Sequence, residues 1–294
     1  MRRLRKFGKV AYNYPLANLV TFKVGGPAKA VVWVETEEQL LGLIDYLIAI
    51  ECPYYILGRG SNVLPLDEGF AGVVIVLKLN QWRWERESNN VLLNVSAGMK
   101  ISDILGLCIK YGWDGISFMA GIPGTIGGAV KVNAGTAQMS IGERIKRVKI
   151  FSVPNEVRWI SWESDFYGYR YTKLARTDII LKAEIGLKSS PSFKVQNEIR
   201  KFFLQKKQTQ PLFMPSAGCV FKNLPGISAG FLIEKTGLKG KCIGGACVSP
   251  KHANFIVNTG NARAKDVLDL MNLVRERVKR KTGVLLEPEI EILL

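Results

Sequence analysis

Short apolar runs typical of β-strands recur along the first two thirds of the chain. They lie at residues 31–34, 54–57, 73–77, 91–95, 147–153 and 179–187. A capping box, Thr36 to Gln39, follows the first run and predicts a helix. Four apolar residues continue that helix at helical spacing: Leu40, Leu43, Ile44 and Leu47. A second helix is predicted at 102–111, ending at Gly112. The pattern predicts an α+β domain that begins with a β-α-β unit.

The pattern changes at KSSPS, residues 188–192, which we interpret as a linker. A helix at about 194–207 opens the second part of the chain. A long amphipathic helix follows and ends at Gly283, and the chain closes in a predicted strand, VLLEPEIEILL. The residues of that helix expected to face a core are Val267, Leu270, Met271, Val274 and Val278. The sequence therefore predicts one domain at 1–188 and another at 189–294.

Composition places the chain among globular proteins, since 47% of its 294 residues are apolar. The most apolar segment, LLGLIDYLIAI, is too short to cross a membrane and contains Asp45. The start, MRRLRKFGKV, lacks the apolar region of a signal peptide, so we expect a cytoplasmic protein. The net charge of +16 is compatible with an anionic partner or with a lysine-rich proteome. Because no nucleic-acid-binding motif surrounds the basic runs, we expect neither nucleic acid nor a membrane as partner.

Cysteine and histidine usage restricts the chemistry. The five cysteines include no C-x-x-C pair, which suggests neither a zinc site nor a disulfide framework. His252 is the single histidine. A multi-histidine metal site and a histidine-based catalytic triad are therefore excluded within this chain, and we expect no metal.

Glycine-rich segments are the most informative feature. GIPGTIGGAV at 121–130 lacks the lysine of a P-loop and the spacing of a Rossmann fingerprint. Two more lie at VGGPA, 24–28, and GRGSN, 58–62, the latter directly after a predicted strand. Each alone could be an ordinary turn. Because glycine lets backbone N–H groups approach an anion closely, three such turns favour a ligand with several polar parts, such as a dinucleotide.

Seven motifs occur in one order: TFKVGGPA, LGRGSNVL, AGIPGTIGGAVKVNAG, YGYRY, PSAGCVFKN, GGACVSPKHANFIVN and LEPEI. With them, the chain from about residue 15 to its end closely resembles the UDP-N-acetylenolpyruvoylglucosamine reductases, also called UDP-N-acetylmuramate dehydrogenases. The resemblance implies FAD held in a domain of the vanillyl-alcohol-oxidase type. That domain would have two α+β lobes, at about 1–77 and 78–188. An α+β substrate-binding domain would follow at 189–294, with its last strand contributing to the active site. The implied FAD contacts are Gly58, Arg59, Gly60, Ser61, Asn62, Gly121, Ile122, Gly124, Thr125, Gly127 and Gly128.

The resemblance also implies a reaction in peptidoglycan precursor synthesis. NADPH would reduce FAD, and flavin N5 would then transfer hydride to C3 of UDP-N-acetylglucosamine enolpyruvate. Protonation at C2 would give UDP-N-acetylmuramate. Such chemistry needs fixed positive charge near the developing enolate and a positioned acid. Arg170 matches the family arginine that could clamp the carboxylate, although an arginine is more often a surface residue. Glu289 matches the family glutamate, whereas period two alone leaves Glu287 equally possible.

One position departs from the commonest family pattern. Where the family usually has serine as proton donor, this chain has Cys219. A thiol, with an ordinary pKa of about 8.5, is a far stronger acid than an alkanol, so the role is preserved. A small buried cysteine is the ordinary alternative. The resemblance also suggests three contacts to substrate phosphate or sugar: Lys207, Asn223 and Asn254.

Two other functions remain open at this point, and both are disfavoured. A flavin oxidase with another substrate would not need the motifs SAGCVFKN and KHANFIVN, which lie outside the FAD domain. A basic nucleic-acid-binding protein would not need the glycine turns. The short connection after YGYRY suggests the compact type of the family, and we expect a monomer.

Overall fold

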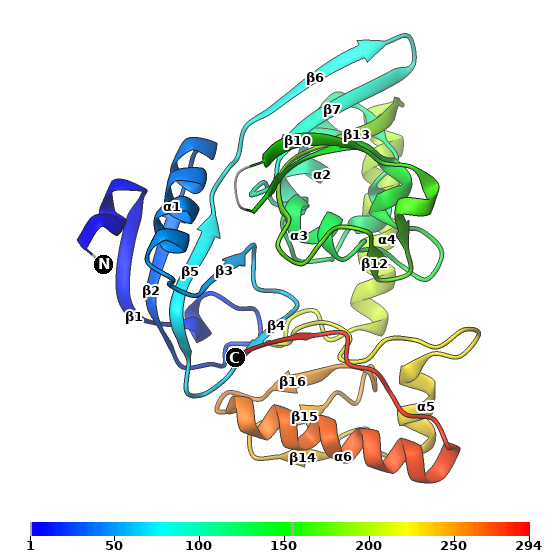
Figure 1. Cartoon of the computed structure of the whole chain (residues 1–294). Coiled ribbons are helices and arrows are strands. Elements are labelled where there is room, and N and C mark those ends of the chain that lie inside the picture. Colours follow the sequence, from blue (N-terminus) through cyan, green and yellow to red (C-terminus); the bar gives the residue numbers. More distant parts are fainter. Residues whose placement is uncertain (1, 154–155) are drawn as a thin grey trace. The chain divides into compact units, whose positions relative to one another are not determined.

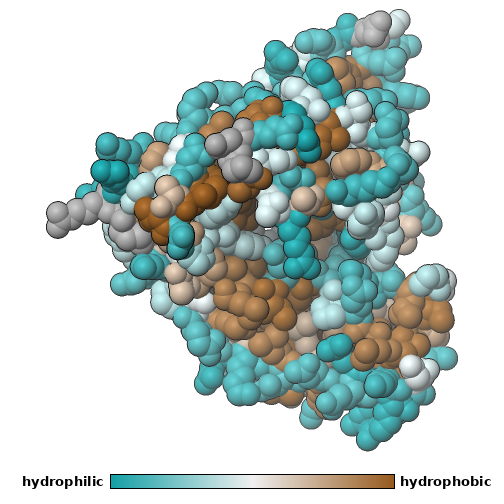
Figure 2. Space-filling view, in the orientation of Figure 1, coloured by the Kyte–Doolittle hydropathy of each residue, from teal (hydrophilic) through white to brown (hydrophobic). Residues whose placement is uncertain are grey.

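The structure is a computed structural model that describes residues 2–153 and 156–294 (Figure 1). Its contacts divide the chain into two compact units. The first unit comprises Met1–Ala11, Val31–Arg59 and Gly72–Gln205. The second comprises Tyr12–Ala30, Gly60–Ala71 and Lys206–Leu294. Figure 2 shows a face that is mostly hydrophilic, as expected for a chain with 41 basic and 25 acidic residues.

A four-stranded sheet near the N-terminus has the order β1-β2-β5-β3. These strands are β1 Lys9–Pro15, β2 Pro27–Val34, β3 Tyr54–Leu57 and β5 Phe70–Leu77. The predicted helix is α1, Glu37–Ala49, and it begins with the predicted capping box at Thr36. The β-α-β prediction is correct in its elements, but β5 lies between β2 and β3 and pairs in parallel with β3. The continuous apolar run of β5 explains this, because a central strand is buried on both faces.

A larger sheet forms the body of the first unit. Its order is β10-β9-β13-β7-β6, and β8 also pairs with β13. Every pairing in it is antiparallel. The strands are β6 Trp82–Glu87, β7 Asn90–Ser96, β8 Trp113–Asp114, β9 Ile145–Ser152, β10 Glu156–Ser161 and β13 Ile179–Ser189.

Three helices and a small hairpin accompany this sheet. They are α2 Ile101–Tyr111, α3 Ile126–Lys131 and α4 Ser192–Thr209, with the hairpin formed by β11 Tyr167–Gly168 and β12 Tyr171–Thr172. Helix α2 ends as predicted at Gly112, which adopts the left-handed conformation. The predicted linker is reduced to Ser190 and Pro191, since β13 and α4 occupy its ends. Short 3₁₀ helices cover Arg2–Lys6, Leu16–Asn18, Ser117–Met119, Ile141–Arg144 and Ser164–Phe166.

The second unit combines small sheets with two helices. Its strands are β4 Val63–Pro65, β14 Cys242–Ile243, β15 Ala246–Val248, β16 Ile256–Asn258 and β17 Glu291–Leu293. The helices are α5 Ala229–Lys235 and α6 Ala264–Thr282. All five residues predicted to face a core from α6 are buried, and Gly283 ends the helix. The predicted C-terminal strand is much shorter, because only β17 forms a ladder, in parallel with β4. Pro288 has no N–H to donate to a ladder.

One expectation about cysteine is wrong. Cys242 and Cys247 form a disulfide, with their Cα atoms 4.1 Å apart. They lie opposite each other in the register of the β14–β15 hairpin. The C-x-x-C criterion missed this pair, because a two-residue turn at Gly244-Gly245 places residues five apart face to face. Within the described residues, no helix could span a membrane, and no group of three or more His, Cys, Asp or Glu side chains could hold a metal ion.

Candidate active site

Two of the predicted FAD-binding turns lie against each other in the first unit. Gly58 follows β3, and a Cβ atom added there would lie 2.6 Å from the Thr125 hydroxyl oxygen. Only glycine permits that approach without a shift. The Thr125 hydroxyl caps α3 by accepting the Gly128 N–H at 3.5 Å. The spacing of the motifs in sequence, 67 residues apart from Gly58 to Thr125, gave no sign of this contact.

The GIPGTIGG segment is a tightly held loop. Its backbone bonds to the preceding chain at four points. The N–H groups of Ile122, Ile126 and Gly127 donate to the carbonyls of Met119, Met99 and Ala97, and Gly124 C=O accepts the Ile101 N–H. Gly121 has φ 76°, a conformation that favours glycine. Gly127 packs on Ala97, where an added Cβ would be 2.8 Å from the alanine Cβ. Gly128, by contrast, is exposed and has room.

The GRGSN turn contributes to both units. Gly58 and Arg59 belong to the first, while Gly60, Ser61 and Asn62 belong to the second. Gly60 has φ 63° and accepts the Thr21 N–H through its carbonyl at 3.0 Å. The eleven predicted FAD contacts include no carboxylate, and they offer backbone amides, two hydroxyls, an amide side chain and one guanidinium. This donor set fits an anionic pyrophosphate.

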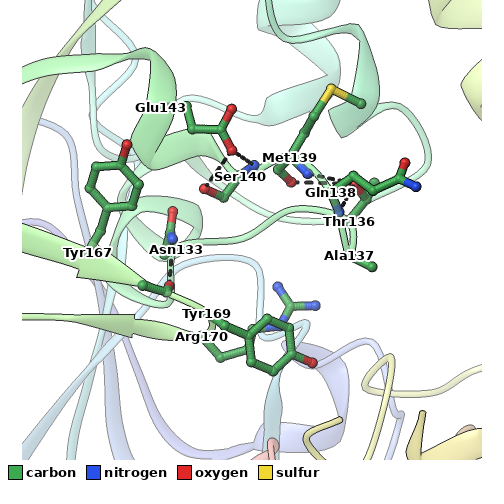
Figure 3. Close-up of a pocket in the computed structure, with 11 residues that line it drawn as sticks. Asn133, Thr136, Ala137, Gln138, Met139, Ser140, Glu143, Tyr167, Tyr169 and Arg170 are labelled. Carbon is green, nitrogen blue, oxygen red and sulfur yellow. Dashed lines mark hydrogen bonds between the residues drawn. The ribbon is translucent and has the colours of Figure 1, made fainter. Parts of the chain in front are cut away.

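Arg170 occupies the tip of the β11–β12 hairpin. It has φ 52°, which is uncommon for a residue other than glycine and costs about 1 kcal/mol or more. Asn133 secures the hairpin, since its side chain donates to Gly168 C=O at 2.7 Å and accepts the Gly142 N–H at 2.9 Å. Tyr169 and Arg170 line a cavity of about 220 Å³ together with the 133–143 segment (Figure 3). A strained residue held by its surroundings is typical of a functional position.

Cys219 lies in the second unit, on a segment held from both sides. The segment pairs with Phe255 through a bridge at Cys219, and Val220 N–H donates to Asn254 C=O at 2.9 Å. On its other side, Val220 C=O accepts the Glu289 N–H at 2.8 Å. The structure therefore brings the backbones of Cys219 and Glu289 together, on adjacent segments of one unit.

The two candidate acids differ in their surroundings. The Glu287 side chain is exposed and forms an ion pair with Lys222. Glu289 is half-buried, and its backbone carbonyl accepts a hydrogen bond from the Asn62 side chain at 3.1 Å. Asn62 C=O in turn accepts the N–H of Glu291, the first residue of β17, at 2.9 Å. These differences favour Glu289, which the residue pattern alone did not separate from Glu287.

The predicted substrate contacts occupy different environments. Asn254 is 2% exposed, and its amide both donates to Phe221 C=O at 2.8 Å and accepts the Phe221 N–H at 3.0 Å. Asn223 accepts the Ala229 N–H at the start of α5. Lys207 is exposed, with its Nζ 5.8 Å from the centre of the Phe213 ring. Asn254 thus acts on the backbone next to Cys219, a role that the sequence did not indicate.

His252 has a structural hydrogen bond. Its Nδ1 accepts the Asn254 N–H at 3.3 Å, and its ring lies edge-on to Phe255. Burial, with a smaller contribution from Lys239, lowers the pKa of His252 below its ordinary value. Folding therefore favours the neutral form of the ring.

Known proteins resemble the chain in both parts. The C-terminal domain of UDP-N-acetylenolpyruvoylglucosamine reductase matches residues 210–293, and an FAD binding domain matches residues 28–158. A UDP-N-acetylenolpyruvoylglucosamine reductase of Caldanaerobacter subterraneus subsp. tengcongensis is 37% identical over 99% of this chain and 96% of its own length. The chain belongs to this reductase family.

Two further relatives agree with this assignment. The reductase of Syntrophobacter fumaroxidans is 41% identical over 96% of this chain and 83% of its own length. The crystal structure of UDP-N-acetylenolpyruvylglucosamine reductase from Thermus caldophilus superposes with a TM-score of 0.82 at 35% identity, covering 97% of this chain and 98% of that chain. The predicted family and the predicted α+β fold, an FAD-binding domain followed by a C-terminal domain, are confirmed. The chain is thus a flavoprotein oxidoreductase with FAD as cofactor and NADPH as the family's reductant.

Proposed function

We propose that this reductase converts UDP-N-acetylglucosamine enolpyruvate into UDP-N-acetylmuramate, using NADPH, in peptidoglycan precursor synthesis. Residues 1–188 would hold FAD and residues 189–294 the sugar nucleotide. The observation that carries the proposal is the placement of Cys219, because its segment is fixed between Asn254 and Glu289. Cys219, Asn254 and Glu289 all lie in the part that matches the C-terminal domain of the reductases, outside the FAD binding domain.

FAD would be held by the two glycine turns. Backbone amides of Gly58 and Gly60 and the side chains of Ser61 and Thr125 would supply donors to the pyrophosphate. Bound FAD supplies a hydride, received from NADPH, to C3 of the enolpyruvyl group. The remaining steps depend on the side chains of this chain.

Arg170 has the first of these roles. Hydride addition at C3 leaves negative charge at C2 and on the adjoining carboxylate. The guanidinium of Arg170 can bind that carboxylate through two N–H donors and stabilise the enolate as it forms. The left-handed backbone at Arg170 and the Asn133 bond to Gly168 fix the hairpin backbone from which this side chain extends.

Cys219 supplies the proton. Its thiol donates H⁺ to C2, and the resulting thiolate recovers a proton from solvent before the next turnover. Glu289 is the second acidic group of the site, on the segment bonded to Val220. We assign it to hydrogen bonding with the developing enolate, a role that requires its protonated form.

The test separates the two half-reactions. The anaerobic holoenzyme is mixed with NADPH and then with UDP-N-acetylglucosamine enolpyruvate, while flavin absorbance is followed. Bleaching by NADPH and recovery with the sugar nucleotide support the whole proposal. Bleaching without recovery would retain the flavin reductase and refute the substrate. A protein that binds no FAD would refute the cofactor site as well.

A further inference from the structure

Strand β6 is the outermost strand of the large sheet and carries an unusual set of side chains. In the described part of the chain it pairs on one side only, with β7 (Figure 1). Its sequence is WRWERE. Trp82 and Trp84 are 37% and 41% exposed, and they lie against Tyr111, itself 39% exposed. Edge strands usually carry charges that oppose pairing with another chain, so the arrangement of these charges matters.

The free backbone groups of β6 can be assigned from its register. Glu87 pairs with Asn90 across a two-residue turn, and such a closing pair is hydrogen-bonded. Hydrogen-bonded pairs alternate along an antiparallel ladder, so Arg83 and Glu85 bond inward to β7. Gln81, two residues before Arg83, also bonds inward, since its C=O accepts the Ser96 N–H at 2.9 Å. The N–H and C=O groups of Trp82, Trp84 and Arg86 therefore point outward, away from the sheet.

A second copy of β6 fits this edge in one antiparallel register. With Trp84 opposite Trp84 of the second copy, the two residues exchange both hydrogen bonds about a twofold axis. Arg83 then lies opposite Glu85 of the second copy, and Glu85 opposite Arg83, as close non-hydrogen-bonded pairs. On the other face, Trp82 lies opposite Arg86, which suits a cation–π contact. The charges of this strand are thus complementary to themselves.

The same register extends a row of polar and charged side chains across the sheet. Arg83 is in register with Asn94, Asn94 with Glu184, and Glu184 with Arg147. Glu184 bonds to Asn94 at 3.0 Å and forms an ion pair with Arg147. The added Glu85 of a second copy would stand next to Arg83, at the end of this row.

We propose that β6 is a homodimer interface, in which two copies pair edge to edge about Trp84 and join their six-stranded sheets. The contact is small, so the dimer belongs to the weak class of specific interfaces. This proposal differs from the monomer expected from the sequence.

Charge reversal with complementation tests the register. The holoenzyme and its variants are studied by sedimentation equilibrium from about 1 to 200 µM protein, a range suited to micromolar affinity. Wild-type protein should dimerise. R83E and E85R each place two like-charge pairs in the interface, and each should weaken dimerisation about tenfold or more. An equimolar mixture of R83E and E85R restores both ion pairs and should dimerise again.

The control is R158E, which makes the same change of charge on β10, the opposite edge strand. It should dimerise like the wild type. Flavin content of every variant shows that it is folded. Wild-type protein that stays monomeric throughout the range would overturn the proposal. So would single variants that dimerise normally, or a mixture that fails to recover.

Discussion

Replacing Asn254 by alanine would test how the Cys219 segment is held. Asn254 is 2% exposed and Phe221 is 1% exposed, so water cannot replace the lost amide easily. The change leaves the N–H and the C=O of Phe221 without their partners. Each unsatisfied buried group costs about 1 to 3 kcal/mol, which gives a loss of about 2 to 6 kcal/mol in the free energy of unfolding.

The assay is urea unfolding of the FAD-free and FAD-bound proteins, followed by the two half-reactions. Ser228→Ala is a matched comparison, since its hydroxyl also accepts one backbone N–H, that of Phe231, but at an exposed helix start. That variant should lose about 1 kcal/mol. Asn254→Ala should also slow flavin reoxidation by the sugar nucleotide more than flavin reduction by NADPH, because the Cys219 segment loses its support.

Two results would refute this reasoning. A loss of stability no larger than that of Ser228→Ala would mean that the Phe221 backbone is satisfied in another way. Equal slowing of both half-reactions would mean that Asn254 does not act through the Cys219 segment.

Three other changes give separate predictions. Cys219→Ala should leave flavin reduction by NADPH nearly intact and slow flavin reoxidation by about 100-fold or more. Cys219→Ser should retain substantial activity. Equal loss in both half-reactions of the alanine variant would contradict the donor role. Gly58→Ala places a Cβ 2.6 Å from the Thr125 hydroxyl and should weaken FAD retention during gel filtration, whereas Gly106→Ala, with no atom within 4 Å, should retain FAD normally. Because the pKa of His252 is lowered on folding, the unfolded chain binds the extra proton, and stability should fall as pH drops below about 6.5. Urea unfolding of His252→Gln between pH 7.5 and 5 should show a smaller fall than the wild type, and identical slopes would rule the effect out.

Local patterns predicted most regular elements, because each had its own signal. The capping box at Thr36, the glycine stop at Gly112 and the apolar face of α6 all appear in the structure. Order within a sheet had no comparable signal. The insertion of β5 between β2 and β3 depends on contacts between distant segments, which periodicity does not record. The disulfide of Cys242 was missed for a similar reason, since it follows from hairpin register.

The three predicted catalytic residues came from motifs, but the hydrogen bonds that support their backbones were not predicted. Each lies on irregular backbone, where an asparagine side chain replaces the support of a regular ladder. Asn133 bonds to the carbonyl two residues before Arg170, and Asn62 bonds to the carbonyl of Glu289 itself. Asn254 does the same two residues after Cys219.

This common arrangement has a physical reason. A side-chain amide offers a donor and an acceptor at a fixed separation, so it can satisfy the backbone of a segment that must leave the sheet. Aspartate would keep the shape and lose the donor that each of these carbonyls requires. Exchange of Asn133, Asn254 or Asn62 for aspartate should therefore disturb the backbone that carries Arg170, Cys219 or Glu289, respectively. Alanine in place of an exposed asparagine should not have this effect.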